Sequence, residues 1–145
     1  MLRRMVAADL PAVVALLTDD VLGAGRETAD PAPYERAFAA VDADPAHLLV
    51  VADDGGTVAG TLQLSFLPGL SRGGALRAQV EGVRVAAAAR GRGLGEAMLR
   101  WCAAEARRRG AALLQLTTDV RRPDARRFYE RLGFEASHVG MKLPL

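Results

Sequence analysis

The sequence is poor in cysteine, lysine and aromatic residues, and it has no long apolar run. The one cysteine, Cys102, excludes an internal disulfide and a metal site built from several cysteines. No segment is apolar over the length that a membrane-spanning helix needs. The N-terminal MLRRMVAADL lacks the apolar stretch and the cleavage site of a signal peptide. We therefore expect a cytoplasmic protein without a membrane partner.

Charge is nearly balanced, with 19 basic against 17 acidic residues, and Lys142 is the only lysine. Such a preference for arginine is typical of a GC-rich bacterial genome. The cluster Arg107–Arg109 falls where a helix is expected to end, and cations stabilise the helix dipole there. Because no basic face is indicated, we expect no nucleic-acid partner. The two histidines and scattered carboxylates show no metal-ligand spacing, so we expect no metal.

The order of the predicted elements indicates one α/β domain over residues 1–145, with a mixed, mostly antiparallel central sheet. Half of the residues are apolar, which is enough for one sizeable core. The pattern predicts a sheet of six to seven strands and about four flanking helices. Strands are expected at 2–5, 47–53, 57–66, 76–85 and 111–118, with one or two more after Phe134; helices are expected at 9–17, 34–41, 94–109 and 123–132.

The strand at 76–85 changes its apolar phase half-way along. Ala78 and Val80 share one phase of the alternation, whereas Val83 and Val85 share the other. A bulge at Glu81-Gly82 would keep all four on one face, and glycine is common in bulges. Alternatively, both faces of the strand are buried and the alternation has no meaning. A bulge would splay this strand from its neighbour and re-aim Glu81.

The segment RGRGLGEAML, residues 90–99, places three glycines directly before a helix-like sequence. It lacks the Lys and Ser/Thr of a nucleotide P-loop, and Glu96 stands where a dinucleotide fingerprint needs its last glycine. Bare backbone at the start of a helix nevertheless suits a pyrophosphate, because free N–H groups and the helix dipole both favour an anion. Arg90 and Arg92 would add positive charge. The alternative is a tight turn with exposed arginines.

The longer segment VRVAAAARGRGLGEAML resembles the acyl-CoA-binding signature of the GNAT superfamily of N-acetyltransferases, in which Q/R-x-x-G-x-G/A corresponds to residues 90–95. A second segment, DVRRPDARRFYERLGF, resembles the family's later motif through Ala125, Phe128, Tyr129, Gly133 and Phe134. The family usually has Asn where this chain has Asp119, or Arg122 in another alignment. The resemblance implies the GNAT-like fold, in which a central strand is splayed.

The same resemblance implies that acetyl-CoA is the co-substrate. The strand backbone at Val83 and Val85 would pair with the pantetheine arm as with an added strand. The amides of residues 90–96 would surround the pyrophosphate, and Asp119, unlike Asn, would accept a hydrogen bond without donating one. The implied cofactor-binding residues are Val83, Arg84, Val85, Arg90, Gly91, Arg92, Gly93, Leu94, Gly95, Glu96, Asp119, Ala125 and Phe128.

Acyl transfer to an amine requires a group that takes the amine proton, a donor for the leaving sulfur and a donor for the thioester oxygen. Tyr129 is the candidate acid, because a phenol is protonated at neutral pH; alternatively its ring only fills the core. Glu81 is the candidate base, directly or through water; alternatively it is an exposed strand carboxylate or an acceptor within the bulge. His138 and His47 are fallback bases, and a backbone N–H near Val83 is the expected oxyanion donor.

The sequence thus predicts an N-acetyltransferase that moves the acetyl group of acetyl-CoA to a primary amine of a small molecule or peptide by direct attack. The alternative function is a non-catalytic acyl-CoA-binding regulatory module on the same fold. Cys102 lies at helical spacing with apolar residues and is expected in the core, not as an acyl carrier. The sequence leaves a homodimer open.

Overall fold

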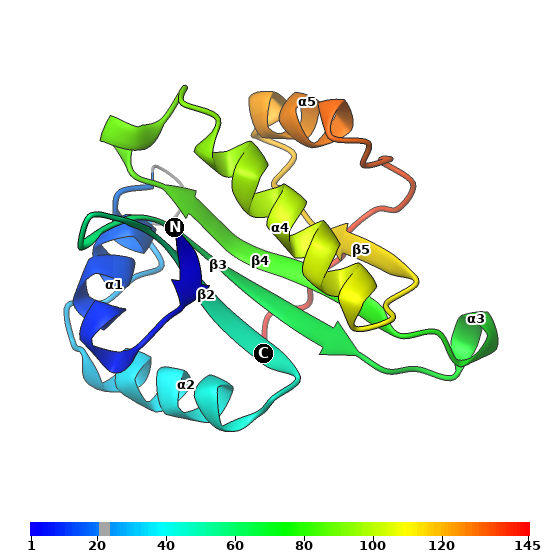
Figure 1. Cartoon of the computed structure of the whole chain (residues 1–145), viewed down its shortest axis with the longest axis horizontal. Helices are drawn as coiled ribbons and strands as arrows, with labels where there is room; N and C mark the ends of the chain where they lie inside the picture. The colour runs from blue at the N-terminus through cyan, green and yellow to red at the C-terminus, as the bar shows by residue number, and fades with distance from the viewer. Residues whose placement is uncertain (21–23) are drawn as a thin grey trace.

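A computed structural model describes residues 1–20 and 24–145 and shows a central sheet with helices on both faces (Figure 1). The sheet has five strands in the order β1-β2-β3-β4-β5. Neighbours are antiparallel from β1 to β4, whereas β5 runs parallel to β4. The strands are β1 (Leu2–Arg4), β2 (His47–Asp54), β3 (Thr57–Leu67), β4 (Arg77–Val85) and β5 (Leu113–Leu116).

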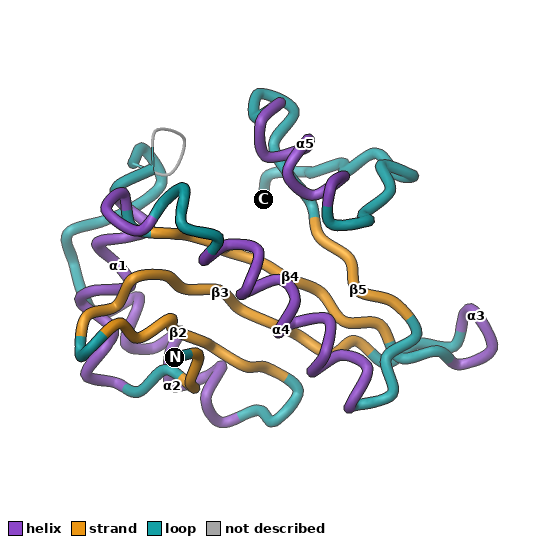
Figure 2. Tube along the Cα trace, turned by 45° about the horizontal axis from the view of Figure 1, so that its top comes forward, coloured by secondary structure: helices purple, strands orange, loops and turns teal. Residues whose placement is uncertain are grey.

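Five α-helices accompany the sheet in the part of the chain that the structure describes. Figure 2 shows α1 and α2 on one face and α4 crossing the other. The helices are α1 (Leu10–Thr18), α2 (Ala32–Ala43), α3 (Ser71–Gly74), α4 (Leu94–Arg108) and α5 (Pro123–Arg131), with short 3₁₀ turns at Ala7–Asp9 and Ala87–Ala89. The connection between β3 and β4 contains the single turn α3.

The main core lies between α4 and the sheet, because α4 repeats apolar residues at helical spacing on one side. Met98, Leu99, Cys102 and Ala106 are the buried residues of this helix. They belong to one cluster with buried residues of β2, β3 and β4, and partly buried Leu94 and Trp101 pack against it. A smaller cluster of Met5, Val13 and Val51, with partly buried Phe38 and Leu49, lies under α1 and α2.

The prediction of six to seven strands is wrong: the described residues form five. The expected strands after Phe134 are the cause, because residues 135–145 have no regular secondary structure and are exposed throughout. The tail alternates apolar and polar residues as a strand does, but a strand forms only beside an edge with which its backbone can pair. In this chain the tail lies on no such edge.

The predicted bulge in β4 is confirmed. Between the pairs Gln63–Glu81 and Thr61–Arg84 the register shifts, so that one residue of β3 faces two of β4. Gly82 has φ +60°, which favours glycine. The shift brings Val83 and Val85 back to the α4 face, where they pack against the same cluster that contains Ala78 and Val80.

Candidate active site

Gly91 and Gly93 form a tight turn directly before α4, and Gly95 is the second residue of that helix. Gly91 and Gly93 have φ +73° and +77°, a conformation that strains other residues. Gly93 caps the helix, and the amide of Ala97 donates to its carbonyl at 3.0 Å. The amides of residues 94–96 precede this first helical bond and therefore have no acceptor within the helix. Such a helix start suits an anion such as a diphosphate.

Gly95 has a different role from the other two glycines, because α5 lies against it. A Cβ at this position would lie 3.5 Å from the Phe128 ring and 3.8 Å from Val85. These are ordinary van der Waals distances, so a methyl group would fit here, and Gly95 marks the place where α4, α5 and the end of β4 converge. Phe128 and the partly buried Ala125 belong to the one half-buried stripe of α5. The second motif is thereby brought against the first.

Beyond the bulge, β4 has no neighbour on the β5 side. The parallel pairing ends at Val80–Leu116, so residues 81–85 pair only with β3. Ala86 donates to the carbonyl of Ala59 in β3, and by strand alternation Val83 and Val85 turn their backbone groups to the open side. Both carbonyls accept arginine N–H groups: Arg84 donates to Val83 at 2.9 Å, and Arg90 Nε donates to Val85 at 3.1 Å.

Tyr129 lies in an aromatic cluster beside this open edge. Its ring centroid is 5.3 Å from that of Phe128 and 5.8 Å from that of Phe134. Burial raises the pKa of the Tyr129 hydroxyl, and the cations of Arg122 and Arg84 partly oppose that rise. The hydroxyl is therefore protonated at neutral pH, as an acid must be. No hydrogen bond to this hydroxyl is seen among the residues that the structure describes.

An ion-pair cluster lies next to Tyr129, and the sequence analysis did not predict it. Asp20, just after α1, binds Arg84 of β4 at 3.2 Å and also binds Arg122, which precedes α5. The side chains of Asp20 and Arg84 are 14% and 23% exposed, so the pair is well shielded from water. The sequence contains no signal for this cluster, because its members lie 64 and 102 residues apart.

Glu81 extends from the bulge on the sheet face opposite α4. It is exposed and accepts a hydrogen bond from Gln79 Nε2 at 3.1 Å. Gln79 in turn accepts from Gln115 of β5 at 2.8 Å. Glu81 and Tyr129 therefore approach from opposite faces of the sheet, at the point where β4 and β5 stop pairing.

Asp119 is held in a local turn. Its carboxylate accepts from the backbone and side-chain N–H groups of Arg121 and lies 3.9 Å from Arg26. The guanidinium of Arg121 is the main cause that holds the pKa of Asp119 well below its usual range. Glu96 is paired with Arg100 one helical turn on, at 2.7 Å. Glu96 is thus engaged within its own helix, whereas Asp119 is engaged by its own turn and by the more distant Arg26.

The two histidines lie apart from the site's other groups. His47 Nδ1 lies 2.8 Å from the hydroxyl of Ser65, at the start of β2 and two strands away from β4. His138 lies on the exposed tail, where its Nδ1 is 2.7 Å from the hydroxyl of Ser137. Neither side chain is brought next to Tyr129 or the glycine turn by a described contact.

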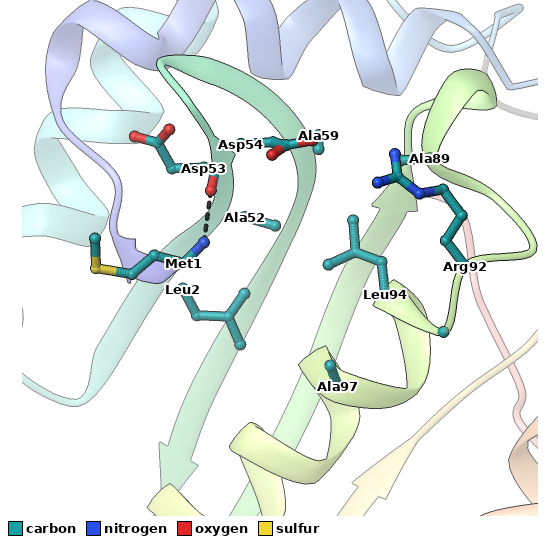
Figure 3. A pocket seen from close by; sticks show the side chains of 11 residues that line it. Met1, Leu2, Ala52, Asp53, Asp54, Ala59, Ala89, Arg92, Leu94 and Ala97 are labelled. Atoms are coloured by element: carbon teal, nitrogen blue, oxygen red, sulfur yellow. Dashed lines mark hydrogen bonds between the residues drawn. The ribbon is translucent and has the colours of Figure 1, made fainter.

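Two cavities flank the N-terminal half of the molecule. One of about 390 Å³ opens beside the start of α4, on the side of β1 and β2 (Figure 3). Arg92, Gly93 and Leu94 line it together with the carboxylates of Asp53 and Asp54, which do not suit an anionic group. The second, about 540 Å³, lies between α1 and α2. Neither is lined by Tyr129 or Glu81, so neither defines the acceptor.

Cys102 is fully buried, and burial raises the pKa of its thiol to about 12. It is a core residue, because a thiol that does not ionise is a poor nucleophile. Within residues 1–20 and 24–145, no three His, Cys, Asp or Glu side chains form a group that could hold a metal ion. In the same ranges, no helix is both long and apolar enough to cross a bilayer.

A family model described as acetyltransferase (GNAT) family matches residues 11–134, and this range includes the glycine turn, the open β4 edge and Tyr129. The chain belongs to the GNAT acetyltransferase family. The resemblance seen in the two sequence motifs is therefore confirmed. The family uses acetyl-CoA as co-substrate, and the bared amides and the unpaired strand edge fit a diphosphate joined to an amide-containing arm.

Solved structures extend this likeness to the whole chain. A crystal structure of a transcriptional regulator from Bacillus halodurans is 45% identical, with a TM-score of 0.98 over 100% of this chain and 99% of that one. A structure from Clostridium acetobutylicum, described as a predicted acetyltransferase with acetyl-CoA, is 18% identical, with a TM-score of 0.78 over 99% of this chain and 95% of that one; it shows the fold alone.

One curated relative is similar over a shorter segment. An aminoalkylphosphonate N-acetyltransferase from Salmonella typhimurium is 47% identical over 49 residues, which are 34% of this chain. The matched segment spans 32% of that relative's length.

Proposed function

We propose that this GNAT protein is an acetyl-CoA-dependent N-acetyltransferase that acts on a primary amine by direct attack. The observation that carries the proposal is the convergence at one place of the helix start with free amides, the open β4 edge and the Tyr129 hydroxyl. A binding module needs only the first two features. A protonated, shielded phenol beside them supplies the acid that transfer requires.

Residues of two elements hold the co-substrate in this proposal. The amides of Leu94, Gly95 and Glu96 bind the diphosphate, and Arg90 and Arg92 add charge beside them. The outward N–H and C=O groups of Val83 and Val85 pair with the pantetheine arm. Arg90 must then release the Val85 carbonyl, to which it donates in this structure. Asp119, Ala125 and Phe128 border the same site from the second motif.

When bound, acetyl-CoA supplies an acetyl thioester whose C–S bond is exchanged for a C–N bond on the acceptor. Glu81 takes the proton that the amine loses, directly or through a water molecule. The backbone N–H near Val83 donates to the thioester oxygen as negative charge develops there. Tyr129 donates its proton to the departing sulfur, Glu81 passes the amine proton to solvent, and solvent reprotonates Tyr129. Proton count and charge therefore balance over the cycle.

The base is tested by Glu81→Gln, with Glu35→Gln on the exposed side of α2 as the matched control. We expect the first substitution to lower kcat about 10²-fold, because a positioned base contributes roughly that much or more. The control should leave kcat unchanged. A kcat for Glu81→Gln equal to that of the wild type would show that a group other than Glu81 accepts the proton.

The activity is tested by thiol release from acetyl-CoA across a panel of primary amines, with mass spectrometry of each product. Aminoalkylphosphonates belong in the panel because of the name of the Salmonella relative. We expect one class of amine to gain 42 Da, the mass of one acetyl group in place of hydrogen. Products acetylated on oxygen, or acetylation of the enzyme itself, would contradict direct N-acetylation.

The second candidate is an acyl-CoA-binding regulatory module, and the name of the Bacillus halodurans structure favours it. It predicts acetyl-CoA binding in calorimetry without thiol release for any amine in the panel. Arg90→Glu should abolish binding under both functions. Only turnover distinguishes the two functions. Tyr129→Phe should slow turnover if the protein is an enzyme, and it should have no effect on acetyl-CoA binding under either function.

A further inference from the structure

Two arginines from distant segments meet at one carboxylate beside the open β4 edge. Arg84 of β4 and Arg122, which precedes α5, both donate to Oδ2 of Asp20; we call these two residues the arginine pair. Two guanidinium groups on one carboxylate leave one net positive charge. The side chains of Arg84, Arg122 and Asp20 are 23%, 32% and 14% exposed, so water screens this charge only in part. The cluster therefore attracts an anion.

The arginine pair has N–H donors that nothing in the described part of the chain accepts. Arg84 Nε is buried without a partner there, and Nη1 of the same group donates to the Val83 carbonyl. The side chain of Arg122 makes its hydrogen bond to Asp20 through Nη2. A shielded donor without an acceptor costs free energy, and hydrogen bonds from a guanidinium to an oxyanion are among the strongest in proteins. An oxyanion is thus the ligand that the free donors suit.

The arginine pair lies away from the diphosphate end of the open edge. The Val83 carbonyl, to which Arg84 donates, is two residues further from the glycine turn than the carbonyl of Val85. Two residues of extended chain span about 7 Å. Burial raises the pKa of the Tyr129 hydroxyl, and the charges of Arg122 and Arg84 oppose that rise, so both cations lie near the candidate acid. The pair therefore borders the place of acetyl transfer.

The candidate base lies on the same face of the sheet as Arg84. Val83 and Val85 pack against the core on the α4 side, so strand alternation turns Arg84 to the opposite face, where Figure 2 shows α1. Glu81 also faces that side, and Asp20 comes directly after α1. An acceptor that enters from the α1 face meets the base and the arginine pair together.

We propose that the acceptor carries an oxyanion a few bonds from its primary amine, and that Arg84 and Arg122 bind this oxyanion. The inference rests on the proposed acetyltransferase function and adds the chemical class of the acceptor, an amine with a carboxylate or a phosphate group. When the pantetheine arm takes the Val83 carbonyl, Nη1 of Arg84 loses its acceptor and becomes available to the oxyanion. Asp20 holds both guanidinium groups in place before the acceptor binds.

The first test compares acceptors that differ in the anion. 3-Aminopropanoate is compared with 3-aminopropanamide, and 2-aminoethyl phosphate with 2-aminoethanol. We expect kcat/KM to be about 10- to 100-fold higher for the anionic member of at least one pair, as a hydrogen bond between charged groups implies. The pair with the larger preference shows whether the site takes a carboxylate or a phosphate. Equal kcat/KM within both pairs would overturn the inference and leave the acetyltransferase function standing.

The second test removes one cation at a time. Arg84→Gln and Arg122→Gln each leave one guanidinium on Asp20, so neither variant strands an unpaired carboxylate. We expect each to lower the ratio of kcat/KM for the anionic over the neutral acceptor about tenfold. The matched control is Arg126→Gln, because Arg126 is 63% exposed on α5 and pairs with Glu130; it should keep the wild-type ratio. A ratio that survives in both test variants would contradict the assigned anion site.

Binding tests the inference separately from turnover. 3-Aminopropanoate and 2-aminoethyl phosphate are titrated calorimetrically into protein saturated with CoA, which has no acetyl group to transfer. We expect the better of the two to bind about tenfold more weakly to Arg122→Gln than to wild type. Such binding without acetylation of any amine would refute the proposed function and keep the arginine site. Acetylation of neutral amines without such binding would refute the inference and keep the function.

Discussion

At the scale of single residues, the packing of Tyr129 determines the protonation state of its hydroxyl. Its ring belongs to a cluster with Phe128 and Phe134, which fixes the direction of the hydroxyl. Burial is the main cause that raises its pKa. Since a group with a raised pKa keeps its proton as the pH rises past 10, the acid form is present throughout the neutral and mildly alkaline range.

Tyr129→Phe keeps both ring contacts and removes only the hydroxyl group. We expect kcat to fall about 10²-fold, while the Kd for CoA changes less than about twofold. In the wild type, loss of kcat from Tyr129 ionisation should begin at a higher pH than the ionisation of a free phenol, because burial raises the pKa of Tyr129. Stopped assays from pH 6 to 10 with calorimetric CoA titration check both statements. Equal losses of kcat and of CoA affinity would instead assign the hydroxyl to binding.

Gly93 and Gly110 are matched glycines at the two ends of α4. Their φ angles are +77° and +76°, and neither has an atom within 4 Å of the position of a Cβ. Alanine at either position is strained by the backbone and should cost about 1 kcal/mol of stability. Only Gly93→Ala should also weaken CoA binding, about tenfold, because it alone disturbs the amides at the helix start. Chemical denaturation and calorimetry measure the two effects separately; equal CoA affinity in the two variants would contradict the assigned anion site.

At the scale of elements, side-chain contacts hold the C-terminal end of α4 in place, whereas its N-terminal end has free backbone amides. Glu105 accepts from Arg108 and Arg109 at 2.7–2.8 Å. Arg109 also donates to the Pro45 carbonyl at 2.9 Å, and its guanidinium lies 4.4 Å from the centroid of Phe66. These contacts tie the end of α4 to the loop before β2 and to the end of β3, and so hold the helix in place over the sheet.

The side chain of Glu105 is 12% exposed, and the guanidinium groups of Arg108 and then Arg109 lower its pKa from 4.5 to about 2. The folded state therefore binds this proton less readily than the unfolded state. The resulting stability is present above pH 4.5 and is lost as the pH falls towards 2.

Glu105→Gln should lower the free energy of unfolding by about 1 kcal/mol at pH 7. The effect is this small because solvent screens the charge of the exposed Arg108. The difference from wild type should shrink as the pH falls from 5 to 3. Urea unfolding at several pH values measures it. A difference that is constant with pH would show that packing and not charge makes the contribution.

At the scale of the whole molecule, Asp20 connects three segments that are distant in sequence. It joins the end of α1 to Arg84 of β4 and to Arg122 before α5, at the mouth of the open β4 edge. Arg84 Nε is buried and has no hydrogen-bond partner among the described residues, so this guanidinium depends on its ion pair. Loss of the carboxylate leaves two cations close together in a shielded place.

Asp20→Asn should therefore lower the free energy of unfolding by about 1–2 kcal/mol. The adjacent Asp19 is the matched control: it is 64% exposed and lies 3.9 Å from Arg90, so Asp19→Asn should cost less than about 0.5 kcal/mol. Thermal unfolding of Asp20→Asn and Asp19→Asn measures this difference in stability. Equal melting temperatures would show that the cluster is not a structural link.

Local patterns in the sequence were sufficient for most of the elements. The glycine turn, the helix that follows it and its end near Gly110 could be predicted because glycine conformation and apolar periodicity act over a few residues. The bulge at Gly82 was visible in the same way, as a change of phase between Val80 and Val83. Family membership followed from two such local motifs.

What the sequence by itself determined is therefore the identity of the elements and the chemistry that each carries. Only the tertiary structure decided that Asp20 meets Arg84 and Arg122, that Arg90 and Arg84 occupy the carbonyls of the β4 edge, and that residues 135–145 form no sixth strand. The reason is physical: turns and helix ends are set by neighbours along the chain, whereas an ion pair or a paired strand needs a partner that only folding, or a second chain, brings near.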